Sequence, residues 1–160
     1  VPHVSVEPGR SVAGPTTVTL YTVTGLKRVE LGEGISRLYV SIDGGMSDNI
    51  RPALYEAAYT ALVANRRPDP QAGLVRSRVV GKHCESGDVV VRYCYLPADL
   101  QAGDILAVPA TGAYCYVLGS NYNFLTRPPV IATAEGKPSR VMIRRQREED
   151  MLALDMGSDI

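Results

Sequence analysis

The chain has 160 residues, which is enough for one domain with a substantial hydrophobic core, or for one domain and part of another. Its 17 basic and 17 acidic residues balance to a formal charge of zero without any basic run, so the sequence lacks the electrostatic footprint of a nucleic-acid-binding protein. No apolar stretch approaches the roughly 20 residues of a membrane-spanning helix, and three cysteines cannot all pair, so we expect a cytoplasmic protein with reduced thiols and no membrane partner.

The first residues of the chain are predicted to be the end of a domain. Val4 to Glu7 predicts a short strand that stops at Pro8, because the residue before a proline is driven to extended geometry. The chain starts at Val1 without an initiator methionine, and we expect it to be a segment of a longer protein. We predict that residues 1–14 complete one domain and that residues 15–160 form the next.

Most of the remaining chain is predicted to be β-structure. Short segments rich in β-branched residues and tyrosine alternate with Gly, Pro and Asp. The predicted strands are 17–23, 38–42, 79–80, 88–96, 105–108, 130–134 and 140–144. The Glu-Gly-Lys-Pro sequence at 135–138 predicts a hairpin connection. Strands this short and closely spaced favour a barrel or sandwich over alternating βαβ units, and we predict one β-barrel domain.

Helical signals are few. Asn49 to Tyr59 predicts a turn or two of helix, with Pro52 tolerated only near its start. Gly112 to Ser120 predicts a short helix, and Glu148 to Leu154 predicts a final one whose acidic first turn suits the helix dipole. The proline-containing segment from Asn65 to Gly73 predicts a surface loop.

The first two candidate clusters carry arginines. In Glu7-Pro8-Gly9-Arg10, a glycine allows backbone N–H groups to approach an anion, and the guanidinium offers a fork of donors to phosphate or carboxylate. An ordinary turn with a solvated arginine is the alternative. Further on, Arg51 and Tyr55 are four residues apart and would share a helix face, where they could grip a carboxylate. The alternative is a surface arginine packed along a tyrosine ring.

The segment from Lys82 to Asp88 contains the most unusual string, His83-Cys84-Glu85. A thiol with an ordinary pKa of about 8.5 can remain protonated at neutral pH and still deliver a proton, so Cys84 is a candidate proton donor. Glu85 beside it would raise the thiol pKa, whereas Lys82 or His83 would lower it. A zinc site is disfavoured because the cysteines lack paired ligand spacing, and we predict no metal. The alternative is a buried, inert thiol at the end of a strand.

The last cluster combines Gly112-Ala113-Tyr114 with Ser120-Asn121-Tyr122-Asn123. If a helix begins here, its free N–H groups could bind phosphate with Tyr114 as a partner; the alternative is a half-buried aromatic helix. The chain has nine tyrosines against one phenylalanine, a bias that hints at polar site chemistry. Together the four clusters suit a small zwitterionic molecule with several charges.

These four segments occur in the same order, and over essentially all 160 residues, in diaminopimelate decarboxylases, which the chain resembles. The resemblance is closest to actinobacterial members. It implies a fold-type III pyridoxal-phosphate enzyme, related to alanine racemase and to the ornithine and arginine decarboxylases. On this basis we expect residues 15–160 to form the Greek-key-like C-terminal β-barrel. We expect residues 1–14 to be the last part of an N-terminal (β/α)8 barrel, the rest of which is absent from this chain.

The resemblance also implies cofactor contacts. Glu7 corresponds to the carboxylate that faces the pyridine nitrogen of pyridoxal phosphate and keeps it protonated. Pro8, Gly9 and Arg10 correspond to a stretch near the cofactor phosphate. Tyr114 corresponds to a residue that touches both cofactor and substrate. The lysine that binds the cofactor covalently belongs to the absent barrel.

Substrate roles follow from the same resemblance. Arg10, Arg51 and Tyr55 correspond to substrate contacts, Glu85 to the acidic partner of a substrate ammonium, and Cys84 to the proton donor. Meso-diaminopimelate, the implied substrate, keeps a carboxylate and an ammonium at its distal end, which call for a guanidinium and a carboxylate.

The implied assembly is a homodimer with shared active sites, in which each chain also needs its N-terminal barrel. The implied reaction releases L-lysine and carbon dioxide in the last step of lysine biosynthesis, and we expect the isolated chain to be inactive. Two alternatives stay open: a related decarboxylase acting on ornithine, arginine or carboxyspermidine, and a non-catalytic β-barrel assembly module.

Overall fold

One long strand, β1 (Val18–Glu30), connects the two parts of the sheet in the computed structural model, which describes residues 2–157. Its first part pairs antiparallel with β6 (Ile105–Pro109), and its second part pairs antiparallel with β2 (Ser36–Ile42). The register with β2 shifts between Val23 and Gly25, where the first partner strand gives way to the second. Such an irregularity increases the local twist, which helps one strand to serve two parts of a curved sheet.

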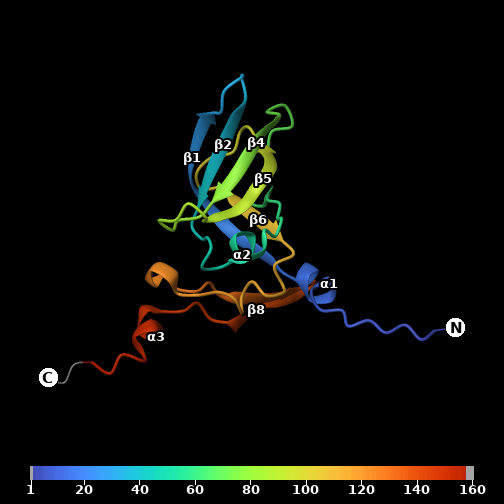
Figure 1. The fold of residues 1–160 in the computed structure, drawn as a ribbon, viewed down its shortest axis with the longest axis vertical. Coiled ribbons are helices and arrows are strands. Elements are labelled where there is room, and N and C mark those ends of the chain that lie inside the picture. Colours follow the sequence, from blue (N-terminus) through green and yellow to red (C-terminus); the bar gives the residue numbers. More distant parts are fainter. Residues whose placement is uncertain (1, 158–160) are drawn as a thin grey trace.

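Six strands form one curled sheet within residues 2–157, in the order β3-β6-β1-β2-β4-β5 (Figure 1). The remaining three are β3 (Leu62–Val63), β4 (Leu74–Val80) and β5 (Val89–Pro97). β2 and β4 are parallel, and the connection between them contains the short helix α2 (Arg51–Tyr55). The predicted mainly β fold class is confirmed, and the curled sheet forms a half-barrel.

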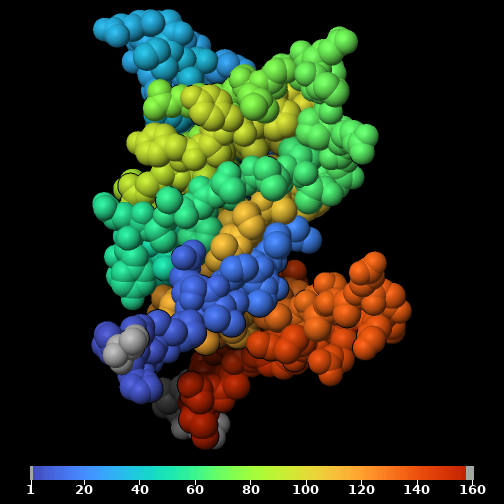
Figure 2. All heavy atoms as spheres, turned by 90° about the vertical axis from the view of Figure 1, so that its right-hand side faces the viewer, coloured from blue at the N-terminus to red at the C-terminus, as the bar shows by residue number. Residues whose placement is uncertain are grey.

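The segments before and after this sheet lie together at one end of it. The N-terminal part contains α1 (Arg10–Ala13) and the 3-10 turn η1 (Gly14–Thr16). The C-terminal part contains a second 3-10 turn, a hairpin and a helix: η2 (Tyr122–Phe124), β7 (Val130–Ala134), β8 (Lys137–Ile143) and α3 (Glu148–Leu152). Figure 2 shows the N-terminal residues in blue between the sheet and the orange and red C-terminal segment. Among residues 2–157, no helix is long and apolar enough to cross a membrane.

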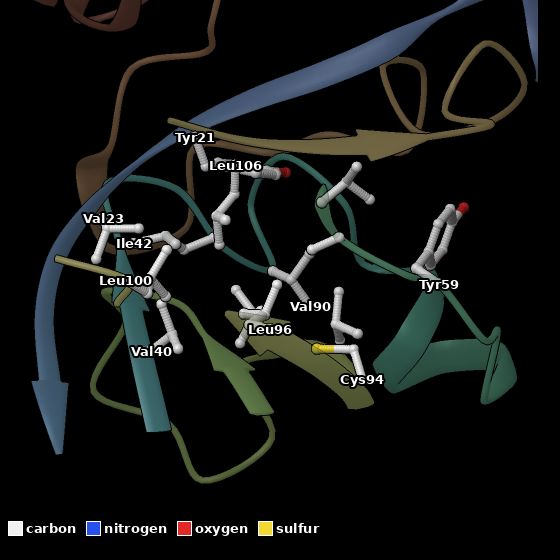
Figure 3. Packing of buried hydrophobic residues seen from close by; sticks show 14 of the residues in the cluster. Tyr21, Val23, Val40, Ile42, Tyr59, Val90, Cys94, Leu96, Leu100 and Leu106 are labelled. Carbon is white, nitrogen blue, oxygen red and sulfur yellow. The ribbon is translucent and has the colours of Figure 1, made fainter. Parts of the chain in front are cut away.

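The hydrophobic core fills the concave side of the curled sheet (Figure 3). Along β2 every second side chain from Leu38 onward is buried, as expected for a strand with one face toward a core. Val40, Val79, Leu106 and Val108 are fully buried. Tyr59 and Cys94 lie at one side of this cluster, next to α2.

The predicted surface loop from Asn65 to Gly73 is fastened to the chain between β5 and β6 by Arg66. Its guanidinium forms two hydrogen bonds with the Asp104 carboxylate, of 2.7 and 2.8 Å, and one of 2.7 Å with Asp99. The hydrogen bonds from Arg66 hold the pKa of both carboxyl groups below the ordinary value. A planar fork paired with a carboxylate in this way fixes the loop geometrically.

Most of the predicted strands are confirmed, with different ends. β7 has the predicted bounds, whereas β4 starts at Leu74 rather than at residue 79. In the first 60 residues, two predictions were wrong in extent or kind. Val4 to Glu7 is not a strand, because these exposed residues have no neighbouring strand to pair with among those described. The helix predicted from Asn49 to Tyr59 is limited to α2, because Glu56 adopts a left-handed conformation that ends it.

Truncating a core side chain should test this packing. Leu106 is 0 % exposed, and we expect Leu106→Ala to lower the free energy of unfolding by about 2–5 kcal/mol, through lost burial and a residual cavity. The matched control is Leu62→Ala on the adjacent β3, where the side chain is 61 % exposed and the change should stay within about 0.5 kcal/mol. Equal losses for both variants in chemical denaturation of the 160-residue chain would contradict this core.

Candidate functional site

Two glycines allow the turn after β2 to lie directly against the loop between β4 and β5. A Cβ atom on Gly45 would stand 2.6 Å from both carboxylate oxygens of Asp88, and one on Gly81 would overlap the same carboxylate. The Asp88 carboxylate also accepts a hydrogen bond of 2.7 Å from the backbone N–H of Met46. Any side chain at either glycine would push the turn and the loop apart.

Cys84 and Glu85 lie on the exposed part of this loop, between two buried residues. His83 and Asp88 form a buried pair, with 2.7 Å between His83 Nδ1 and an Asp88 carboxylate oxygen. The Glu85 carboxylate accepts a hydrogen bond from the Tyr122 hydroxyl, which comes from η2. The loop thus presents a thiol and a carboxylate to the surface while its ends are anchored inside.

The guanidinium of Arg51, at the start of α2, is held from two sides. Nη1 donates a hydrogen bond of 3.0 Å to the Tyr59 hydroxyl, and the guanidinium carbon lies 5.6 Å from the centre of the Tyr114 ring. Burial, together with the Cys115 thiol 3.4 Å away, raises the pKa of Tyr59, which keeps the phenol protonated at neutral pH. Arg51 Nε is buried and has no hydrogen-bond partner within residues 2–157.

The structure does not bring Tyr55 to Arg51, although the two are four residues apart in α2. Tyr55 is the last residue of the helix and is 60 % exposed. No hydrogen bond or ring contact joins it to the guanidinium within the described part of the chain. Tyr59 and Tyr114 occupy the positions around the guanidinium instead, and the role predicted for Tyr55 stays a prediction.

The helix predicted from Gly112 to Ser120 is wrong, because this segment is a series of turns. Tyr114, inside this segment, has a positive φ angle of 69°, which an α-helix does not accommodate. The segment therefore offers no helix N-terminus to a phosphate group. Tyr114 is instead 51 % exposed, with its ring against Arg51.

The N-terminal segment also lies beside Tyr114. A Cβ atom on Gly9 would be only 3.6 Å from the Tyr114 hydroxyl, so the backbone of residue 9 lies beside that ring. Glu7, Pro8 and Arg10 are exposed, and Arg10 begins α1. All four predicted clusters are thus linked through contacts: residue 9 with Tyr114, Tyr114 with Arg51, and the η2 segment with Glu85.

The three cysteines differ in accessibility. Cys84 is exposed, so the alternative of a buried thiol at this position is wrong. Cys94 and Cys115 are buried, and burial raises the pKa of Cys94 to about 11. Within residues 2–157 there is no group of three or more His, Cys, Asp or Glu side chains placed to hold a metal ion.

Sequence reasoning assigned no role to Tyr59, Asp88 or Tyr122. The excess of tyrosine over phenylalanine was the one signal that pointed toward two of them. Asp88 carried no signal, because its importance depends on two glycines that lie 7 and 43 positions before it in the sequence.

A sequence model of the C-terminal sheet domain of pyridoxal-dependent decarboxylases matches residues 12–112. Diaminopimelate decarboxylase of Mycobacterium leprae is 51% identical over 156 residues, which are 98% of this chain and 32% of the relative. That of Corynebacterium efficiens is 48% identical over 155 residues, 97% of this chain and 33% of the relative. The chain therefore spans about a third of the length of the curated relatives that it matches.

Solved structures give the same picture. Diaminopimelate decarboxylase from M. jannaschii in co-complex with L-lysine has a TM-score of 0.82 at 30% identity, covering 94% of this chain and 32% of that chain. The arginine decarboxylase of Paramecium bursaria Chlorella virus bound to agmatine has a lower TM-score of 0.61 at 26% identity, covering 73% of this chain and 30% of that one.

Thiol counting should test the accessibility of the candidate proton donor. We expect one thiol of the native 160-residue chain to react rapidly with an aromatic disulfide reagent at pH 7, because only Cys84 is exposed. All three should react after denaturation. Cys84→Ser should abolish the rapid phase and Cys94→Ser should leave it unchanged; a rapid phase that survives Cys84→Ser would refute the arrangement.

Proposed function

This chain belongs to the pyridoxal-dependent decarboxylases as their C-terminal sheet domain, and we propose on that premise that the protein containing it converts meso-2,6-diaminopimelate to L-lysine and carbon dioxide. Relatives that carry the name diaminopimelate decarboxylase match almost the whole chain. The observation that carries the proposal is the grouping of Arg51, Tyr114, Glu85 and Cys84 on connected loops at one end of the sheet.

The charges of the site suit the distal end of this substrate. That end keeps one carboxylate and one ammonium, which match the guanidinium of Arg51 and the carboxylate of Glu85. Within residues 2–157 neither Arg51 nor Glu85 forms an ion pair with an opposite charge of its own chain, which supports this match. Ornithine lacks the distal carboxylate, so Arg51 would have no partner there. Tyr55, exposed at the end of α2, is proposed as a further substrate contact at this end.

Pyridoxal phosphate fits the groups gathered around Gly9. The backbone of Gly9 is uncovered beside the Tyr114 hydroxyl, and Arg10 is exposed without an acidic partner in the described chain. We propose that Pro8, Gly9, Arg10 and Tyr114 contact the cofactor phosphate and its surroundings, and that Glu7 pairs with the pyridine nitrogen. When bound, the cofactor supplies a ring that takes up the electrons left by departing carbon dioxide.

The side chains of this domain have separate tasks in the proposed reaction. Arg10 and Tyr114 also contact the reacting end of the substrate, and Arg51 and Glu85 orient the distal end. Cys84 Sγ holds the proton that is delivered to the reacting carbon. An exposed thiol suits a site completed by another chain, so we propose a homodimer in which Cys84 and Glu85 serve the partner subunit's cofactor.

The rest of the protein is proposed to supply the lysine that binds the cofactor covalently, on an N-terminal (β/α)8 barrel. Residues 1–14 are proposed to end that barrel, and residues 15–160 to form the C-terminal domain. The free thiols of Cys84, Cys94 and Cys115 support a reducing location such as the cytoplasm.

Lysine release tests the proposed function. We expect the full-length protein loaded with pyridoxal phosphate to release L-lysine from meso-diaminopimelate, and the 160-residue chain alone to release none. Ornithine serves as the control substrate and should react poorly. A cofactor-loaded dimer that releases no lysine but decarboxylates ornithine would replace the proposed substrate with a diamino monocarboxylate.

Replacing Arg51 tests substrate choice. In the full-length protein, Arg51→Ala should lower kcat/KM for diaminopimelate on the order of 100-fold, as expected when a charge-assisted carboxylate contact is lost. Activity on ornithine should change less than about threefold, because that substrate has no carboxylate for Arg51. Arg76→Ala, on the exposed outer face of the sheet, is the matched control and should change neither. Equal losses on both substrates would argue against a distal carboxylate contact.

A further inference from the structure

The strained turn η2 presents Tyr122, a residue that the proposed reaction does not yet use. Asn123 and Phe124 both have positive φ angles, of 55° and 56°, which non-glycine residues adopt only when their surroundings enforce it. The Asn121 side-chain amide stabilises the turn by donating a hydrogen bond of 2.8 Å to the Leu125 carbonyl. Tyr122 is therefore followed by two residues in an unfavourable backbone conformation, which the surrounding contacts maintain.

Tyr122 contacts the loop that carries Cys84 and Glu85 through both parts of its side chain. Its hydroxyl donates a hydrogen bond to Glu85 Oε1. Its ring stacks on His83, with 5.8 Å between the ring centres and 18° between the planes. One tyrosine thus reaches the exposed carboxylate and the buried residue two positions before it.

His83 is itself fixed by Asp88. The side chains are 0 % and 1 % exposed, and His83 Nδ1 lies 2.7 Å from Asp88 Oδ2. That oxygen also accepts the His83 backbone N–H at 2.8 Å, while the other oxygen accepts the backbone N–H of Met46. The buried carboxylate thereby connects the ring beneath Tyr122 to the turn that follows β2.

We infer that Tyr122 is a positioning residue for Glu85, held by the buried His83–Asp88 pair so that Glu85 is oriented before the substrate's distal ammonium arrives. The inference deepens the proposed function and rests on it. A free glutamate side chain loses much rotamer freedom when it is fixed, and fixing it beforehand spares the substrate that cost. Tyr122 uses Oε1, and Oε2 has no hydrogen-bond partner within residues 2–157, so it is available to the ammonium.

A purely structural role for Tyr122 predicts different kinetics. If the tyrosine only supported η2, its substitution would affect stability and leave ligand selectivity unchanged. If it positions Glu85, loss of the hydroxyl should weaken only ligands that carry the distal ammonium. Tyr122→Phe separates the two, because it removes the hydroxyl and keeps the ring stacked on His83.

The first experiment measures kinetics of the full-length enzyme. Tyr122→Phe should raise KM for diaminopimelate about five- to tenfold, a change of the size expected for the loss of one ordinary hydrogen bond, with kcat within about twofold. Binding of 2-aminopimelate, a competitive inhibitor without the distal amino group, should be unchanged. In a Glu85→Gln background Tyr122→Phe should add less than about twofold. Tyr95→Phe, on the outer face of β5, is the matched control and should resemble wild type.

Three kinetic results would overturn the inference: an unchanged KM in Tyr122→Phe, an equal loss for 2-aminopimelate, or full additivity with Glu85→Gln. A second measurement needs no substrate. The hydrogen bond to Glu85 raises the pKa of Tyr122, so absorbance titration of wild type minus Tyr122→Phe should place this ionisation above that of an ordinary tyrosine.

The same titration in Glu85→Gln should move the Tyr122 midpoint down, because the neighbouring negative charge is gone. An unmoved midpoint would show that the two side chains are not paired and would end the inference. If wild-type enzyme released no lysine, the proposed function would fail on its own, while the titration would still decide whether Tyr122 is paired with Glu85.

Discussion

The buried carboxylate of Asp88 is the contact on which the arrangement of the candidate site depends. A carboxylate inside a protein is tolerated only when donors satisfy it, and here two backbone N–H groups and an imidazole do so. Gly45 and Gly81 lack the Cβ atoms that would keep the backbone at a distance. The exposed loop with Cys84 and Glu85 is therefore tied to the end of β2, which is paired with a neighbouring strand on each side.

A second anchor organises the cationic part of the site. The guanidinium of Arg51 is held by the Tyr59 hydroxyl and the face of the Tyr114 ring, so it is oriented by neutral groups that do not cancel its charge. The two anchors thus prepare opposite charges: a cation from α2 and an anion from the loop between β4 and β5. This division matches a substrate end that carries both a carboxylate and an ammonium, as the proposed function requires.

Much of the candidate site faces outward. Glu7, Arg10, Cys84 and Glu85 are exposed, and the chain spans about a third of the length of its curated relatives. These exposed side chains are held by buried residues. Such an arrangement suits a surface that forms one side of a site, with the other sides contributed by other parts of the protein or by a second subunit. This supports the proposal that the N-terminal part of the protein and a partner subunit complete it.

The strands were predictable because side-chain alternation is a local property. The segments 38–42 and 105–108 lie within observed strands, since apolar residues that face a core at every second position favour one conformation wherever the strand lies. The segment 130–134 is also an observed strand, where its β-branched residues favour the extended conformation without a buried face. The motifs around Arg51, Cys84 and Tyr114 were also recognisable, because they are short runs of unusual residues.

The tertiary structure alone decided which of these residues meet. Tyr59 rather than Tyr55 holds Arg51, because α2 ends at Tyr55 and the chain then turns. Residues 112–120 form turns instead of a helix, with Tyr114 at a positive φ against Arg51. Tyr122 reaches Glu85 across 37 positions of sequence. Hydrogen bonds and ring contacts between residues distant in sequence depend on how the sheet curls. No local pattern in the sequence encodes which of these residues come into contact.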